Sequence, residues 1–148
     1  MPKWHHLLAL RYLSHPNGSE LAAPWLRSGD LGGLWLSRSA WSLAVIADAW
    51  AMAHQRRPVI AVPEYICDQS LWPLRQGRAD LVFYAIHSDT LEPDWASMDG
   101  LKADIFLLVH YFGRPNDAEG ARNWCDACGA ILLEDAAHVL APVPGVGE

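Results

Sequence analysis

The chain has 148 residues, of which 51% are hydrophobic and 19% are charged, a composition typical of one globular domain and not of a disordered chain. Its formal net charge is −6 and no basic cluster interrupts the sequence, so a nucleic-acid partner is not expected. The longest apolar runs, residues 105–109 and 130–133, are far shorter than a membrane span, so a membrane partner is not expected either.

The N-terminal part, residues 1–34, shows no regular periodicity and contains two turn clusters, at 16–19 and 29–33. It is therefore expected to form an irregular segment. Its start lacks the long apolar region and the small-residue cleavage site of a signal peptide, which predicts a cytoplasmic protein.

From residue 37 onward, apolar stretches with helical and strand patterns alternate, separated by proline and glycine. The first helix is Ala-rich, with a serine as its expected N-cap, and Pro93 stands just inside the start of a later, short helix. In chain order we expect a helix over 40–54, a strand over 59–62, a helix over 66–76, a strand over 80–86, a helix over 93–100, a strand over 103–110, a helix over 116–128 and a strand over 130–135.

Four alternations of strand and helix are typical of a parallel sheet with right-handed crossovers. The continuous apolar run at 105–109 indicates a strand that is buried on both faces. The predicted fold class is therefore α/β, a three-layer sandwich with a mostly parallel sheet.

Polar residues follow the last expected strand, where Asp135 and His138 come after the apolar run 130–133. Ligands of open α/β sheets bind at the carboxyl ends of the strands. A carboxylate there suits a heteroaromatic cofactor, because it can keep a ring nitrogen protonated and so strengthen an electron sink. Taken alone, an acid at a strand end is more often a helix N-cap.

Three further connections fall on the same edge. Ser37-Arg38-Ser39 precedes the first helix and fits either a phosphate site or plain N-capping. Tyr65 and Tyr111 either border a ring or simply pack at the edge, and His110 is favoured as a buried histidine with satisfied ring nitrogens.

The three cysteines, Cys67, Cys125 and Cys128, are an odd number and do not suggest a disulfide framework. Cys125 and Cys128 form a CxxC pair, but no second pair or nearby histidine completes a zinc site. Buried or surface thiols are therefore favoured over a redox pair or a metal site, and no metal is expected.

From about Ser37 to His138 the chain resembles the DegT/DnrJ/StrS family, pyridoxal-phosphate-dependent aminotransferases of fold type I. Four motifs carry the resemblance, in family order and at family-like spacing. They are Ser37-Arg38-Ser39-Ala40 (S-G-R-S-A in the family), Val62-Pro63-Glu64-Tyr65-Ile66-Cys67 (V-P-x-Y-T-C), Val109-His110-Tyr111-Phe112-Gly113-Arg114-Pro115 (V-H-x-Y-G-x-P) and Leu133-Glu134-Asp135-Ala136-Ala137-His138 (I-E-D-A-A-H).

The resemblance implies pyridoxal 5'-phosphate as the cofactor. Asp135 would pair with the pyridine nitrogen, and His138 would lie near the ring oxygen. Backbone amides and the hydroxyl around Arg38 and Ser39 would hold the phosphate. Cys67 stands where many members carry an aromatic ring that stacks on the cofactor.

In this family the catalytic lysine, which forms the Schiff base, lies well downstream of the motif that ends at His138. The lysines of this chain are Lys3 and Lys102, and neither matches it. Residues 35–148 are therefore expected to be the N-terminal half of a large domain, truncated before that lysine, with no catalytic residue of their own and inactive alone. Lys102 is expected at the opposite edge of the sheet from Asp135.

The family further implies a homodimer, a nucleotide-linked keto sugar as substrate and an amino donor. An alternative is a non-catalytic, degenerate relative that binds a phosphate-bearing ligand or a full-length partner. Its support is Cys67 and Ser37, the latter standing where the family has glycine, a residue suited to positive φ. A third interpretation is an unrelated α/β protein whose edge loops mimic the motifs.

Overall fold

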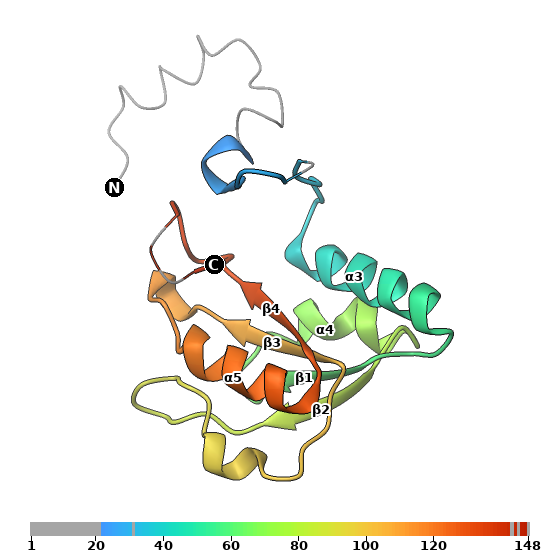
Figure 1. Ribbon diagram of the computed structural model, residues 1–148, viewed down its shortest axis with the longest axis vertical. Helices are drawn as coiled ribbons and strands as arrows, with labels where there is room; N and C mark the ends of the chain where they lie inside the picture. Colours follow the sequence, from blue (N-terminus) through green and yellow to red (C-terminus); the bar gives the residue numbers. More distant parts are fainter. Residues whose placement is uncertain (1–21, 31, 143, 145, 148) are drawn as a thin grey trace, which may run out of the picture. The chain divides into compact units, whose positions relative to one another are not determined.

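The structure is a computed structural model that describes residues 22–30, 32–142, 144 and 146–147 (Figure 1). The chain divides into two compact units, one up to Trp35 and one from Leu36 onward. In the described part of the first unit the chain forms a short 3-10 helix, Ala23–Trp25. The expectation of an irregular segment at residues 1–21 lies outside the described residues.

The second unit is built on a four-stranded sheet with the order β2-β1-β3-β4. All three strand pairs are parallel, and Ile60 of the first strand is aligned with both Leu81 and Ile105. The predicted α/β class is confirmed. The strands are β1 (Val59–Pro63), β2 (Asp80–Tyr84), β3 (Ile105–Val109) and β4 (Ile131–Asp135).

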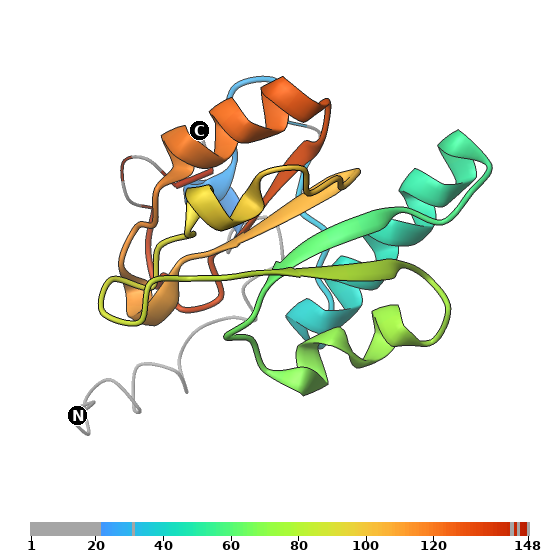
Figure 2. The same ribbon diagram turned by 90° about the horizontal axis from the view of Figure 1, so that it is seen from below.

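Helices cover both faces of this sheet, which gives the three expected layers (Figures 1 and 2). Helices α3 (Ser39–His54) and α4 (Asp68–Arg75) lie on one face, and α5 (Ala118–Cys128) lies on the other. No helix among the described residues is long and apolar enough to cross a membrane.

The core sits on both sides of β3, all of whose residues are buried. Leu107 packs with the helices α3 and α4, whereas Phe106 and Leu108 pack with α5. This alternation confirms that the strand is buried on both faces. Each such side chain contributes about 1.5–3 kcal/mol by leaving water, so β3 anchors the positions of its neighbours.

Helix α5 begins and ends where its flanking residues predict. The Asp117 carboxylate accepts a hydrogen bond of 2.8 Å from the Gly120 amide, and Gly129 follows the helix at φ +74°. A carboxylate cap and a glycine in the left-handed region are the ordinary signals for a helix start and stop.

The short helix expected over 93–100 is present but shorter, as the 3-10 helix Trp95–Met98. Pro93 instead forms an antiparallel bridge with Ile86, and Asp94 caps the Ala96 amide. One local prediction was wrong. The N-cap of α3 is Arg38 and not a serine, because the helix begins at Ser39 itself.

The second expected helix, 66–76, is shorter at its start, since α4 begins at Asp68. Cys67 stays extended at φ −63° and ψ 122°, so it remains in the connection after β1. This keeps its side chain at the carboxyl-terminal edge of the sheet.

Candidate functional site

The topology creates a crevice between β1 and β3. The connection from β1 runs through α4 on one face to β2, and the connection from β3 runs through α5 on the other face to β4. Neighbouring strands whose connections leave in opposite directions form a switch point, where open α/β sheets bind ligands.

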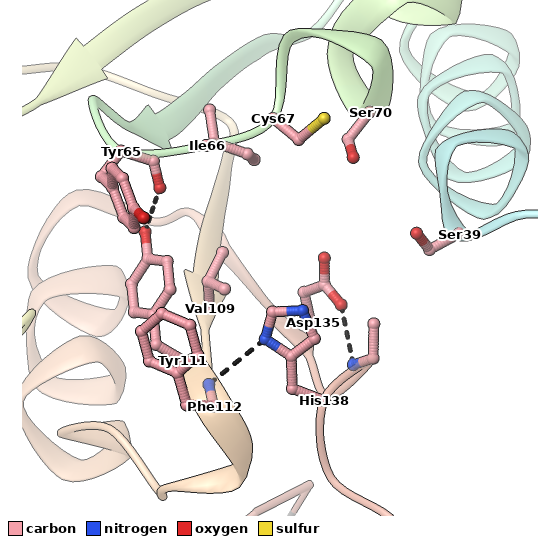
Figure 3. Close-up of a pocket in the computed structure, with 11 residues that line it drawn as sticks. Ser39, Tyr65, Ile66, Cys67, Ser70, Val109, Tyr111, Phe112, Asp135 and His138 are labelled. Atoms are coloured by element: carbon pink, nitrogen blue, oxygen red, sulfur yellow. Dashed lines mark hydrogen bonds between the residues drawn. The ribbon is translucent and has the colours of Figure 1, made fainter.

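A pocket of about 400 Å³ occupies this edge, within the size range of ligand sites. Its walls come from the connections after β1, β3 and β4 and from the first turns of α3 and α4 (Figure 3). The lining residues are Ser39, Tyr65, Ile66, Cys67, Ser70, Val109, Tyr111, Phe112, Asp135, Ala137 and His138.

Asp135 ends β4 on the pocket floor. One carboxylate oxygen, Oδ1, accepts a hydrogen bond of 3.0 Å from the Ala137 amide, which fixes the side chain on its own turn. Its second oxygen has no partner among the described residues and points into the pocket (Figure 3). A partly buried carboxylate oxygen without a partner is free to accept a proton-bearing ring nitrogen.

His138 stands beside Asp135 with its ring against Phe112, at 6.0 Å between ring centroids and an interplanar angle of 15°. Its Nδ1 accepts a hydrogen bond of 3.2 Å from the Phe112 amide. Gly113 passes so close that a Cβ there would lie 3.0 Å from the His138 carbonyl oxygen. The turn that contains Phe112 and Gly113, after β3, is therefore held in contact with the turn that contains His138, after β4.

The start of α3 forms another wall. Ser39 lines the pocket, whereas Arg38 is exposed at the N-cap, outside the lining, and its side chain makes no cap hydrogen bond. The first amides of this 16-residue helix thus lack a side-chain cap, and they favour an anion. Ser37 is not among the residues with positive φ, so serine is unstrained where the family has glycine.

Cys67 and Ser70 face the pocket from the start of α4 (Figure 3). The Ser70 amide donates to the Cys67 carbonyl over 2.9 Å, which brings the two side chains to the same side. Ser70 was not among the residues predicted from the sequence, although its position three residues after Cys67 at the start of a helix was a usable signal.

Tyr65 and Tyr111 form the aromatic wall, with ring centroids 5.7 Å apart. The Tyr111 hydroxyl donates to the Tyr65 carbonyl over 2.5 Å. Burial, and then the neighbouring Tyr65 and Asp135, raise the pKa of Tyr111, so the hydroxyl stays protonated and keeps this bond. The geometry therefore supports the interpretation that the two tyrosines border a ligand pocket over the alternative that they only pack at the sheet edge.

His110 is the buried, satisfied histidine favoured from the sequence. Its Nδ1 accepts from the Asn116 amide over 2.9 Å, so its Nε2 carries the proton and donates to Glu134 over 2.9 Å. Burial opposes the charge of Glu134, but the bonds from His110 and from the Gly147 amide outweigh it and lower the pKa of the carboxyl. Glu134 and Asp135 thus point to opposite faces of the sheet. Glu134 is hydrogen-bonded to His110, whereas one oxygen of Asp135 faces the pocket.

Lys102 lies at the amino ends of the strands, in a separate hollow with Val59 and Asp104, as expected from the sequence. Cys125 is buried and burial raises its pKa to about 12, whereas Cys128 is exposed on the same helix. Among the described residues, no three His, Cys, Asp or Glu side chains come together to hold a metal.

Four of the five cofactor residues expected from the sequence therefore meet in one pocket, and Arg38 lies next to it. Sequence motifs far apart along the chain supplied these positions. The motif after β3 includes Phe112, but it does not predict the left-handed conformation of this residue, whose amide donates to His138.

The chain shares its α/β fold with solved enzymes. The chain resembles the E coli GDP-4-keto-6-deoxy-D-mannose-3-dehydratase with bound hydrated PLP, with a TM-score of 0.64 and 20% identity over 88% of this chain and 36% of that one. It also resembles an aminotransferase from Neisseria meningitidis Z2491, with a TM-score of 0.51 and 18% identity over 66% of this chain and 27% of that one.

The chain thus has the fold of part of a fold type I domain and spans about a third of the length of the solved enzymes it resembles. No family model matches the sequence. No curated protein matches it either.

Proposed function

We propose that the pocket at the carboxyl-terminal edge binds pyridoxal 5'-phosphate, and that the chain is part of an aminotransferase of the DegT/DnrJ/StrS type. One observation carries the proposal. Residues expected from separate motifs to touch one cofactor, Ser39, Cys67, Asp135 and His138, all line the same pocket. A fold shared with a PLP-bound enzyme supports it.

The residues present fit this group. When bound, pyridoxal phosphate supplies an electron sink for carbanion chemistry at an amino-bearing carbon. The free oxygen of Asp135 would hold a proton on the pyridine nitrogen. The uncapped amides of α3 and the Ser39 hydroxyl would bind the phosphate, with Arg38 adding positive charge at the rim.

The other lining residues would position the ring. His138, fixed by the Phe112 amide, would lie near the ring oxygen. The aromatic wall of Tyr65 and Tyr111 would exclude water from one side. Cys67 offers a thiol where many family members offer a stacking ring, so ring contacts would come from this wall.

Members of the family that the chain resembles also use a lysine at this pocket. Lys102 lies at the opposite edge of the sheet, and Lys3 is outside the described residues. We therefore infer that the chain alone binds the cofactor without turnover. For the whole protein we propose a cytoplasmic homodimer that aminates a nucleotide-linked keto sugar with an amino acid as donor.

A second candidate function is the binding of a phosphate-bearing ligand in this pocket by a non-catalytic relative of the family. Cys67 in place of a stacking ring favours it, whereas Ser37 does not, because its backbone is unstrained. The two functions differ in their need for the pyridine ring. Only the cofactor function requires Asp135.

A titration with pyridoxine 5'-phosphate tests the site. This analogue has an alcohol in place of the aldehyde and so forms no imine with the two lysines of the chain. We expect saturable shifts of the amide NMR signals of Ser39, Cys67, Asp135 and His138, with none at Lys102. Shifts confined to Lys102 and Asp104 would contradict the proposal, and equal shifts with inorganic phosphate would favour the second function.

A further inference from the structure

A second hollow, of about 470 Å³, adjoins the cofactor pocket. Tyr65 and Phe112 line both spaces and so form the partition between them. The hollow lies outside the carboxyl ends of β1 and β2, under the loop that joins Ile86 to Pro93. Its lining residues are Glu64, Tyr65, Ile86, Ser88, Leu91 and Phe112.

We propose that this hollow binds an organic cation, such as an ammonium group on a small apolar or hydroxylated skeleton. The inference goes beyond the function proposed above and does not depend on pyridoxal phosphate. It rests on the charge, the aromatic surface and the rigid backbone of the hollow.

The charge of the hollow is negative. Glu64 is its charged lining residue, and its carboxylate makes no hydrogen bond or ion pair with any described residue. The Glu64 carboxylate is exposed, so it attracts a cation with the strength of a Coulomb contact at the protein surface. The neighbouring hollow, lined by Asp89, Glu92 and Arg114, also carries a net negative charge.

The walls of the hollow are aromatic and exposed. Tyr65 is 57% exposed and Phe112 is 69% exposed, although both are large rings. Ring faces attract cations through their quadrupole, and an acid beside them adds a direct Coulomb attraction. Ile86 and Leu91 supply the apolar contact for the carbon skeleton, and the Ser88 hydroxyl supplies a polar contact.

The backbone of the hollow is strained and held in place. Leu91 and Phe112 have φ values of +63° and +55°, in the left-handed region that side chains of this size avoid. The Leu91 amide donates to the His87 carbonyl over 2.8 Å, and its carbonyl accepts from Asn116 over 3.0 Å. Strain that its surroundings maintain in this way is concentrated at ligand sites, and it places the Phe112 ring on the rim before any ligand binds.

The test uses choline and its neutral isostere 3,3-dimethylbutan-1-ol, followed by the methyl NMR signals of Ile86 and Leu91. We expect saturable shifts with choline at these methyls, none at Val109 in the cofactor pocket, and weak shifts with the neutral isostere. Glu64→Gln should weaken choline binding about fivefold, a loss in the range of one ion–carboxylate contact at the surface. Phe112→Leu should weaken it about two- to threefold.

Two matched variants complete the design. Glu119→Gln removes the same charge from an exposed position on α5 and should leave choline binding unchanged. Asp135→Asn should also leave it unchanged, which separates this site from the cofactor site. Equal binding of the neutral isostere, tighter binding of glucose than of choline, no saturable shift, or an unaltered affinity in folded Glu64→Gln would each overturn the proposal.

Discussion

At the amino-terminal edge of the sheet, the Asp104 carboxylate accepts three hydrogen bonds. Two come from the Arg56 guanidinium, over 2.6 and 2.8 Å, and one comes from the Val59 amide, over 2.8 Å. At the carboxyl-terminal edge, Asp135 has one bond within its own turn and an oxygen that faces the pocket. The amino-terminal hollow is the larger, at about 520 Å³ against 400 Å³. The volumes of the two hollows therefore do not separate the proposed ligand site from the amino-terminal hollow, whereas the hydrogen bonding of their carboxylates does.

The same contrast recurs within β4. Glu134 is hydrogen-bonded to buried His110, and the next residue, Asp135, has one carboxylate oxygen without a partner among the described residues. Successive residues of a strand point to opposite faces, so one acidic dipeptide provides a structural group, Glu134, and the proposed binding group, Asp135. Substitutions of Glu134 or His110 should change the free energy of unfolding, and substitutions of Asp135 should change ligand binding.

The largest effect on stability is expected for His110→Ala. It leaves the Glu134 carboxylate without its buried donor and the Asn116 amide without its acceptor, which should cost about 3 kcal/mol. Urea unfolding measures the change. His87→Ala, at an exposed histidine, serves as the control and should cost about 0.5 kcal/mol or less. Equal losses in the two variants would show that the His110 network is not structural.

A smaller loss is expected at the amino-terminal edge. The bond from Arg56 lowers the pKa of Asp104, although burial opposes this, and the Val59 amide adds to the lowering. Asp104→Asn removes the charge behind the bond to the Val59 amide and should lower the free energy of unfolding by about 1 kcal/mol. A variant as stable as the parent chain would indicate that this pairing contributes nothing.

A loss of similar size, but one that depends on pH, is expected at Glu134. Because the folded chain lowers the pKa of Glu134, the carboxylate stabilises the fold above its unfolded pKa of about 4.3, and this contribution is lost as the pH falls through the lower folded value. Glu134→Gln should therefore cost about 1 kcal/mol at pH 7. In acid unfolding series, the difference from the parent chain should shrink below pH ~4. A difference that is constant with pH would contradict this assignment.

The sequence predicted the parts of the molecule that depend on local pattern. The apolar run at Ile105–Val109 and the helix expected over 116–128 each have a local cause, and the structure has β3 and α5 at these positions. The motifs also placed Asp135 and His138 at the correct edge, because strand ends in a parallel sheet share one side.

Other features depend on partners that are distant in the sequence. The bridge of Pro93 to Ile86 and the left-handed turn at Phe112 each need a second segment in place. The unpaired state of Glu64 and of the second Asp135 oxygen is likewise a property of the assembled edge. No local pattern encodes it, and for this reason the second hollow was not anticipated.

The most direct test of the contrast between the two edges is the affinity for pyridoxine 5'-phosphate, measured by calorimetry, in the matched pair Asp135→Asn and Asp104→Asn. We expect Asp135→Asn to keep the stability of the parent chain and bind about tenfold more weakly, a loss of about 1.4 kcal/mol. Asp104→Asn should bind like the parent chain despite its lower stability. Equal affinity in both variants, or a loss only in Asp104→Asn, would contradict the assignment of the cofactor site to the carboxyl-terminal edge.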